Sequence, residues 1–144
     1  MKIDIVKLRP DAVLPEYQTA GAAGADLHAC IDAPITLQPL ERRMIPTGLS
    51  MAIPLGYEVQ VRARSGMSIK HGITMVNGIG TIDADYRGEV GVLAINLSQE
   101  AFTIEPGMRI AQMVVAKYET IGWNEVDVLD ETDRGISGYG SSGS

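Results

Sequence analysis

Prolines at short intervals constrain the fold of this chain more than any other feature of its sequence. They separate brief apolar runs, and they stand at Pro34, Pro39, Pro46 and Pro54. Proline lacks a backbone N–H and fixes φ, so this spacing excludes long helices and central parallel strands. Short strands with turns roughly every eight to twelve residues indicate an antiparallel sandwich, jelly roll or barrel.

The apolar runs around these prolines predict where the strands lie. We expect strands at residues 2–8, 25–30, 35–37, 43–45, 49–53, 57–61, 102–105 and 109–118. At most one short helix is expected, beginning at Ser65. The chain has 144 residues, enough for one domain with a proper core. Aromatic residues make up only 5%, so the core must be built from Val, Ile, Leu, Met and Ala.

Composition also limits the expected partners and compartment. No run of about 18 apolar residues occurs, which predicts a soluble protein without a membrane partner. Cys30 is the single cysteine, so no internal disulfide can form, which fits a reducing cytoplasm. We expect Cys30 to be a small buried residue. The net charge of −6 repels duplex DNA, so no nucleic-acid partner is expected. A phosphate-bearing ligand would need a local cluster of arginines and backbone amides together with a cation.

Residues 75–97 combine features expected of a chemical site. Two runs rich in β-branched residues flank a polar centre at residues 83–89, which predicts a β-hairpin with the polar residues at its tip. In an extended chain Asp83 and Asp85 would share a face, and the pKa of one carboxyl would rise into a range useful for proton abstraction. The alternative is an ordinary exposed turn in which Asp85 pairs with Arg87 in water.

Two further stretches suggest contacts to an anion or another ligand. Ser65 follows Arg64 at the expected helix start, where a free hydroxyl and free N–H groups would bind an anion. A capped surface turn is the alternative. Gln112 lies in an apolar strand and needs partners for both ends of its amide, either as a structural bridge or as a ligand contact.

Asp26 lies in a strand of small and apolar residues, where an unpaired carboxylate is costly. It is expected to have an arginine or a metal-bound water as its partner. The preceding Gly21 and Gly24 allow either a close backbone approach to a ligand or a tight packing corner. His28 has no companion at ligand spacing and is expected to be a satisfied surface histidine.

The last residues, 130–144, contain too little apolar surface to fold alone. We therefore expect a single β-barrel domain at residues 1–129 and a mobile C-terminal arm at residues 130–144. Two residues of this arm suggest a function: Arg134 provides a positive charge that could bind phosphate, and Tyr139 provides a ring that could stack on a base. The alternative is an inert tail.

Five stretches, taken in order, resemble the motifs of the trimeric dUTPase family, whose members hydrolyse deoxyuridine triphosphate to dUMP and pyrophosphate. They are Ala-Gly-Ala-Ala-Gly-Ala-Asp-Leu at 20–27, Arg-Ser-Gly at 64–66, Asn-Gly-Ile-Gly-Thr-Ile-Asp-Ala-Asp-Tyr-Arg-Gly at 77–88, Gly-Met-Arg-Ile-Ala-Gln at 107–112 and Arg-Gly-Ile-Ser-Gly-Tyr-Gly-Ser-Ser-Gly at 134–143. The expected fold is all-β, an antiparallel, jelly-roll-like distorted β-barrel with at most one short helix and a flexible C-terminal arm that closes over an active site. The implied role is to keep uracil out of DNA and to supply dUMP for thymidylate synthesis.

The resemblance implies roles for the residues around the expected hairpin. Asp83 would be the general base that activates a water for attack on the α-phosphorus. Tyr86 would lie against the deoxyribose and leave no room for a 2′-hydroxyl. The uracil edge would be read by Asn77, Thr81, Ile82 and Gly91.

The resemblance also implies how the phosphates are held. They would be gripped by Arg64, Ser65, Gly66 and Gln112. Asp26 would act through water on a Mg²⁺ ion chelated by the triphosphate. Arg134 would reach the terminal phosphate while Tyr139 stacks on the base as the arm closes. Family members have each site at a subunit boundary, so a homotrimer is expected in which the arm covers a neighbour's site.

Two alternatives come from other functions of such a fold. A dCTP deaminase would carry a catalytic glutamate at the position that Leu93 occupies here. A nucleotide-binding or protein-interaction module without catalysis is the second alternative. The presence of Asp83, Arg64, Gln112 and Arg134 counts against it.

The chain departs from the usual family pattern at three places. The family's Asn-Ala-Pro-Gly is Asn-Gly-Ile-Gly at residues 77–80, which loosens the turn and keeps Asn77. The usual phenylalanine of the arm is Tyr139, and residues 136–137 replace a more glycine-rich pair. None of these changes removes a catalytic group implied by the resemblance.

Overall fold

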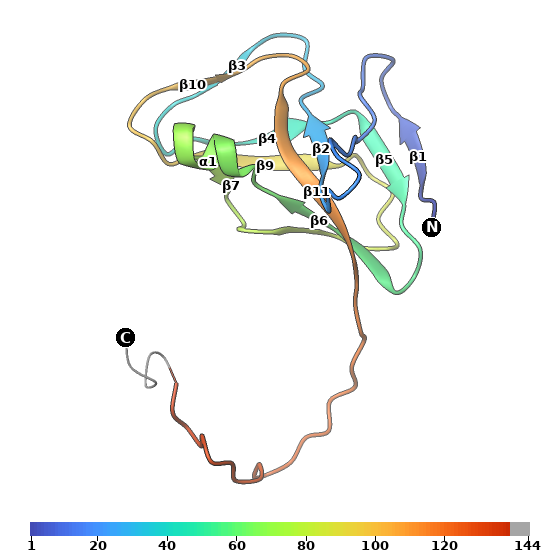
Figure 1. Cartoon of the computed structure of the whole chain (residues 1–144), viewed down its shortest axis with the longest axis vertical. Helices are drawn as coiled ribbons and strands as arrows, with labels where there is room; N and C mark the ends of the chain where they lie inside the picture. The colour runs from blue at the N-terminus through green and yellow to red at the C-terminus, as the bar shows by residue number, and fades with distance from the viewer. Residues whose placement is uncertain (139–144) are drawn as a thin grey trace.

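The computed structural model describes residues 1–138, which form eleven short strands and one short helix (Figure 1). The strands are β1 Asp4–Lys7, β2 Ala25–His28, β3 Ile35–Leu37, β4 Arg42–Pro46, β5 Leu49–Ala52, β6 Tyr57–Arg62, β7 Ile73–Met75, β8 Gly80–Ile82, β9 Gly91–Asn96, β10 Phe102–Ile104 and β11 Arg109–Lys117. The helix is α1, Ser65–His71. Every pairing between these strands is antiparallel. The all-β prediction with one short helix is therefore confirmed.

The proline-rich segment forms β3, β4 and β5, as its spacing predicts. Pro39 lies in the turn between β3 and β4, and Pro46 is the last residue of β4. Side chains alternate between the core and the surface along the following strands, as the two-residue period of a strand requires. Val59 and Val61 of β6, for example, are buried, while Gln60 between them is half-exposed.

The strands join into four open sheets around one aliphatic core. The sheets have the strand orders β2-β11-β6-β8, β4-β9-β7, β1-β5 and β10-β3. Hydrogen bonding within residues 1–138 does not close these sheets into one continuous barrel. The largest fully buried apolar side chains are Leu27, Leu37, Ile45, Leu49, Ile73, Ile104 and Ile110. Residues 1–138 contain no helix of the length and apolarity that crossing a bilayer requires.

The predicted hairpin across residues 83–89 is wrong, because the two strands on either side of this loop belong to different sheets. β8 pairs with β6, with Ile82 opposite Val59. β9 pairs with β4 and with β7, a short strand that the sequence pattern did not identify. Residues 83–89 therefore form a crossing loop between two sheets, and the apolar runs beside it find their partners far away in the sequence.

The C-terminal segment leaves the body of the protein after β11 (Figure 1). Residues 118–137 are all exposed, including Trp123, whose side chain is 90% exposed. A local turn near Arg134 is closed by a bond from its Nε to the carbonyl oxygen of Ser137, 2.9 Å away. The division into a domain at 1–129 and an arm at 130–144 stays a prediction, and the last strand of the body already ends at Lys117.

Candidate functional site

Asp26 is the centre of a polar cluster on the four-stranded sheet. It lies in β2, and only 6% of the residue is exposed. Its Oδ1 accepts a hydrogen bond from Nε of Arg64 at 3.1 Å, and its Oδ2 accepts one from a terminal nitrogen of Arg109 at 3.2 Å. The predicted arginine partner is therefore confirmed, and there are two of them. Their positive charges offset the cost of burying the carboxylate.

Gln112 of β11 lies directly opposite Asp26 in the strand register. Its Nε2 donates to the carbonyl oxygen of Ala63 at 3.3 Å, so the residue acts as a structural bridge at this end of its amide. The Oε1 end lies over Gly24, where an added Cβ would be 2.6 Å from it. Gly24 therefore provides the space that the amide of Gln112 occupies.

The start of α1 lies at the same end of the sheet. Arg64 has extended backbone angles before the first helical residue, and the helix has no side-chain cap. Ser65 and Gly66, which open the helix, are exposed. Because the first N–H groups of a helix have no intrahelical acceptor, this end can donate to an anion. The capped-turn alternative does not describe this helix start.

The loop at residues 83–89 is held by bonds within itself and by bonds from Gly48 and Ser50. The hydroxyl of Tyr86 donates to the carbonyl oxygen of Glu89 at 3.0 Å, and its ring covers Gly88 so closely that a Cβ there would overlap it. Arg87 donates to the carbonyl oxygens of Ala84 and Tyr86, and not to Asp85 as the exposed-turn alternative expected. Asp83 is exposed at the point where β8 ends.

The residues expected to contact uracil lie beside this loop. Asn77 is exposed, and its Nδ2 lies 3.4 Å from the position of a Cβ on Gly80. Gly78 has a φ of +73°, a conformation that favours glycine, so the departure from the family's alanine suits the turn found here. Thr81 is exposed and Ile82 half-buried. Gly91 begins β9 with the side chain of Met44 close against it.

The chain does not bring these two groups of residues together within a single copy. Gln112 pairs with both Asp26 and Arg62 across the sheet, whereas Ile82 pairs with Val59. Ile82 is therefore displaced from Asp26 by three strand spacings, about 14 Å, and by three residues along β6, about 10 Å. Asp83 is one residue further away. The Asp26 cluster and the loop at 83–89 are separate regions of the surface.

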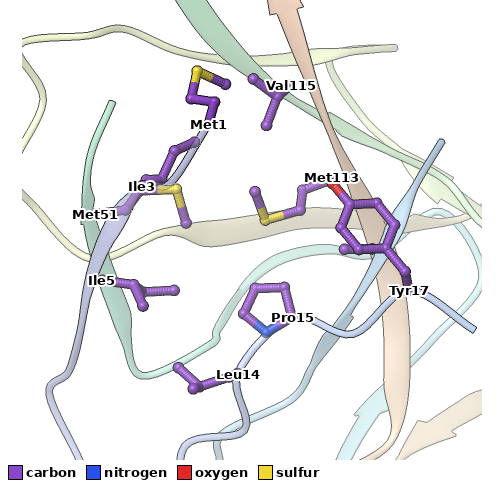
Figure 2. A pocket seen from close by; sticks show the side chains of 10 residues that line it. Met1, Ile3, Ile5, Leu14, Pro15, Tyr17, Met51, Met113 and Val115 are labelled. Carbon is purple, nitrogen blue, oxygen red and sulfur yellow. The ribbon is translucent and has the colours of Figure 1, made fainter. Parts of the chain in front are cut away.

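An apolar groove of about 350 Å³ lies elsewhere on the molecule (Figure 2). It is lined by residues of β1, β5, β2 and β11 together with the chain before β2: Met1, Ile3, Ile5, Leu14, Pro15, Tyr17, Ala25, Met51, Met113 and Val115. Ala25 and Met113 neighbour Asp26 and Gln112 in sequence. Successive side chains of a strand point to opposite faces, so the groove and the polar cluster are on opposite sides of the β2–β11 pair. The groove is not part of the polar site.

Sequence reasoning missed Arg109 and misjudged His28. Arg109 is the first residue of a mostly apolar strand. The need of the buried Asp26 for a cationic partner is the one feature of the sequence that could have identified it. His28 is half-buried, and its buried Nδ1 has no hydrogen-bond partner in the part of the chain that is described, so it is not a satisfied surface histidine.

Cys30 is buried as expected, and this burial raises the pKa of its thiol. Tyr139 lies outside the described residues.

Stability should fall in mildly acidic solution because of His28. Burial lowers the pKa of its imidazole below the ordinary value of 6.5, against the opposing effect of Asp26. The unfolded chain then binds more protons than the folded one below pH 6.5, so the free energy of unfolding decreases as the pH drops from 6.5 toward the lowered pKa. Urea unfolding at several pH values should show this slope, and His28→Gln should flatten it. His71→Gln, at an exposed position, is the control and should leave the slope unchanged. An unchanged slope in His28→Gln would contradict the assignment of this pH dependence to His28.

Gly24→Ala should weaken the polar site without unfolding the protein. The added methyl group would meet the end of the Gln112 side chain, which can rotate away, whereas the backbone angles of Gly24 suit any residue. If Gln112 binds the substrate, losing one bond to a charged group predicts a roughly tenfold to hundredfold lower kcat/KM. Gly21→Ala is the matched control, since nothing lies within 4 Å of a Cβ there. Equal activity of the two variants would contradict this role of Gly24.

The arginines at Asp26 and the uncapped start of α1 are donors that can bind a phosphate group, and they lie on an all-β scaffold. The model of the dUTPase family matches residues 11–143, and the chain belongs to this family. The chain is 54% identical over 143 residues to the deoxyuridine 5′-triphosphate nucleotidohydrolase of Finegoldia magna, covering 99% of both chains. It is 60% identical over 131 residues to that of Roseobacter denitrificans, covering 90% of this chain and 86% of the other. The solved structure of Staphylococcus bacteriophage 80alpha dUTPase with dUpNHpp is similar, with a TM-score of 0.90, 27% identity and 99% coverage of both chains.

Proposed function

We propose that this protein hydrolyses dUTP to dUMP and pyrophosphate, which would keep uracil out of DNA and supply dUMP for thymidylate synthesis. The observation that carries the proposal is the fixed position of Arg64 between the buried Asp26 and the uncapped start of α1, with Gln112 beside them. Relatives that share more than half of its residues have names that state this activity.

The phosphates would bind at the Asp26 cluster. Arg64 and Gln112 would donate from their side chains, and Ser65 and Gly66 from the first turn of α1. Residues 1–138 contain no group of three or more His, Cys, Asp or Glu side chains that could hold a metal. Asp26 would contact a Mg²⁺ ion carried by the triphosphate through water, because each carboxylate oxygen can accept a second hydrogen bond. Such an ion would neutralise part of the phosphate charge.

The reaction would depend on Asp83. Its exposed carboxylate would take a proton from a water molecule as that water attacks the α-phosphorus. The new bond joins the water oxygen to the α-phosphorus, the bond to the bridging oxygen breaks, and pyrophosphate leaves. Tyr86, fixed by its bond to Glu89, would exclude a 2′-hydroxyl. The uracil edge would be read by Asn77, Thr81, Ile82 and Gly91.

A complete site would need more than one subunit. The loop at 83–89 lies far from the Asp26 cluster in one chain. We therefore propose a homotrimer in which one subunit contributes the Asp26 cluster and another contributes the loop. The exposed apolar side chains of Trp123, Val128 and Leu129 support packing of the C-terminal segment on another copy. The segment would then bring Arg134 and Tyr139 to a neighbour's site.

A pyrophosphate-release assay with dUTP and Mg²⁺ tests the proposal. Rapid release from dUTP and little from UTP, dTTP or dCTP is expected, together with a solution mass of three subunits. Ammonia released from dCTP would instead support a deaminase, although β9 has the apolar Leu93 at the position of the deaminase glutamate. A folded protein that binds dUTP without releasing pyrophosphate would support a module without catalysis.

A further inference from the structure

We propose that Arg109 is a positioning residue that fixes Arg64 for the triphosphate, and this inference rests on the proposed function. Both arginines hold the same buried carboxylate, one at each oxygen of Asp26, at 3.1 and 3.2 Å. Arg64 also donates from a terminal nitrogen to the backbone carbonyl oxygen of Arg109 at 3.2 Å. Arg109 is therefore linked to Arg64 directly through its backbone and indirectly through its side chain.

These contacts determine which part of Arg64 remains for a ligand. Its Nε faces Asp26 and one terminal nitrogen faces Arg109, so two of the three guanidinium nitrogens are already bound. In the part of the chain described, no hydrogen bond uses the remaining terminal nitrogen of Arg64. Because the guanidinium is planar, fixing two nitrogens also fixes the direction of the third. Two guanidiniums against one carboxylate further leave an excess positive charge at the cluster.

A local irregularity of β11 is what brings Arg109 to this side of the sheet. Arg109 pairs with His28 and Ala111 with Leu27, so β11 has one extra residue there. The consecutive residues Ile110 and Ala111 are both fully buried, at 1% and 0% exposed, as expected at such a bulge. In a regular strand Arg109 would share the core-facing side of Ala111, two residues away. The bulge instead directs it to the face of Asp26.

The test measures affinity for the triphosphate separately from affinity for the nucleoside. In Arg109→Gln, the Kd of dUpNHpp with Mg²⁺ should rise at least tenfold, while the Ki of deoxyuridine should change less than about twofold. Arg42→Gln is the control for net charge, because Arg42 is exposed on β4 away from the cluster, and it should change neither constant. An unchanged Kd in Arg109→Gln, or an equal loss for both ligands, would overturn the inference.

Two further variants separate positioning from a general effect on folding. Arg109→Lys keeps the charge and loses the planar group, so its Kd should lie between those of the wild type and Arg109→Gln. If Arg109→Gln does not fold, a wild-type Kd in Arg109→Lys would overturn the inference. In an Arg64→Gln background, Arg109→Gln should raise the Kd much less than it does alone. Equal effects in both backgrounds would mean that Arg109 does not act through Arg64.

The outcome also distinguishes the two proposals. A wild-type protein that releases no pyrophosphate from dUTP would refute the proposed function. A wild-type protein that hydrolyses dUTP, together with a folded Arg109→Gln variant of normal affinity, would refute only the role of Arg109.

Discussion

Asp83→Asn is expected to lower kcat for dUTP by about 10²–10⁴-fold, with little change in the Kd of dUpNHpp. The side-chain amide keeps the size and polarity of the carboxylate but cannot accept the proton of the attacking water. Asp83 is exposed at the end of β8, so its replacement removes no buried partner and should not affect folding. Single-turnover hydrolysis and equilibrium binding measure the two quantities separately.

The same loop offers a matched control for this variant. Asp85 is also exposed and lies two residues away, and it has no role in the proposed reaction. Asp85→Asn should keep turnover within about threefold of the wild type, as expected for a surface substitution. Full turnover in Asp83→Asn would mean that another group accepts the proton.

Deleting residues 134–144 is expected to lower kcat/KM for dUTP by about a hundredfold or more. The deletion removes Arg134, and arginines that reach a transferring phosphoryl group can contribute larger factors than this. It also removes the segment proposed to close the site against bulk water. The residues from 118 to 137 are exposed, so the Tm of the body should change by less than about 2 °C.

The readouts for the truncation are pyrophosphate release and thermal unfolding on the same samples. A chain lacking only Ser144, which lies beyond the matched stretch at 134–143, is the control and should behave like the wild type. A large loss of Tm with the longer deletion would show that the arm is part of the folded body. Normal kcat/KM would show that Arg134 is not needed.

The sequence predicted local structure well and strand partners poorly. The spacing of Pro34, Pro39, Pro46 and Pro54 located β3 to β6, because proline acts on its own neighbours in the chain. The hairpin prediction failed because partner choice depends on the whole fold. The β-branched residues around Ile82 can pair with β6 as well as they could pair with β9.

The candidate site shows the same division. The need of Asp26 for an arginine follows from burying a charge, and the structure confirms it. Arg109 becomes the second partner because of a bulge in β11, and the pattern of apolar residues does not predict that bulge. The half-buried state of His28 likewise depends on how neighbouring strands cover it.

The separation of Asp83 from the Asp26 cluster within one sheet has a consequence for how such a protein evolves. If chemistry requires regions from two copies, a solitary subunit is inert however well it folds. Rate then depends on protein concentration as well as on the reacting groups. Residues at contacts between copies, remote from any nucleotide, would then be under selection as strict as that on the proposed catalytic carboxylate.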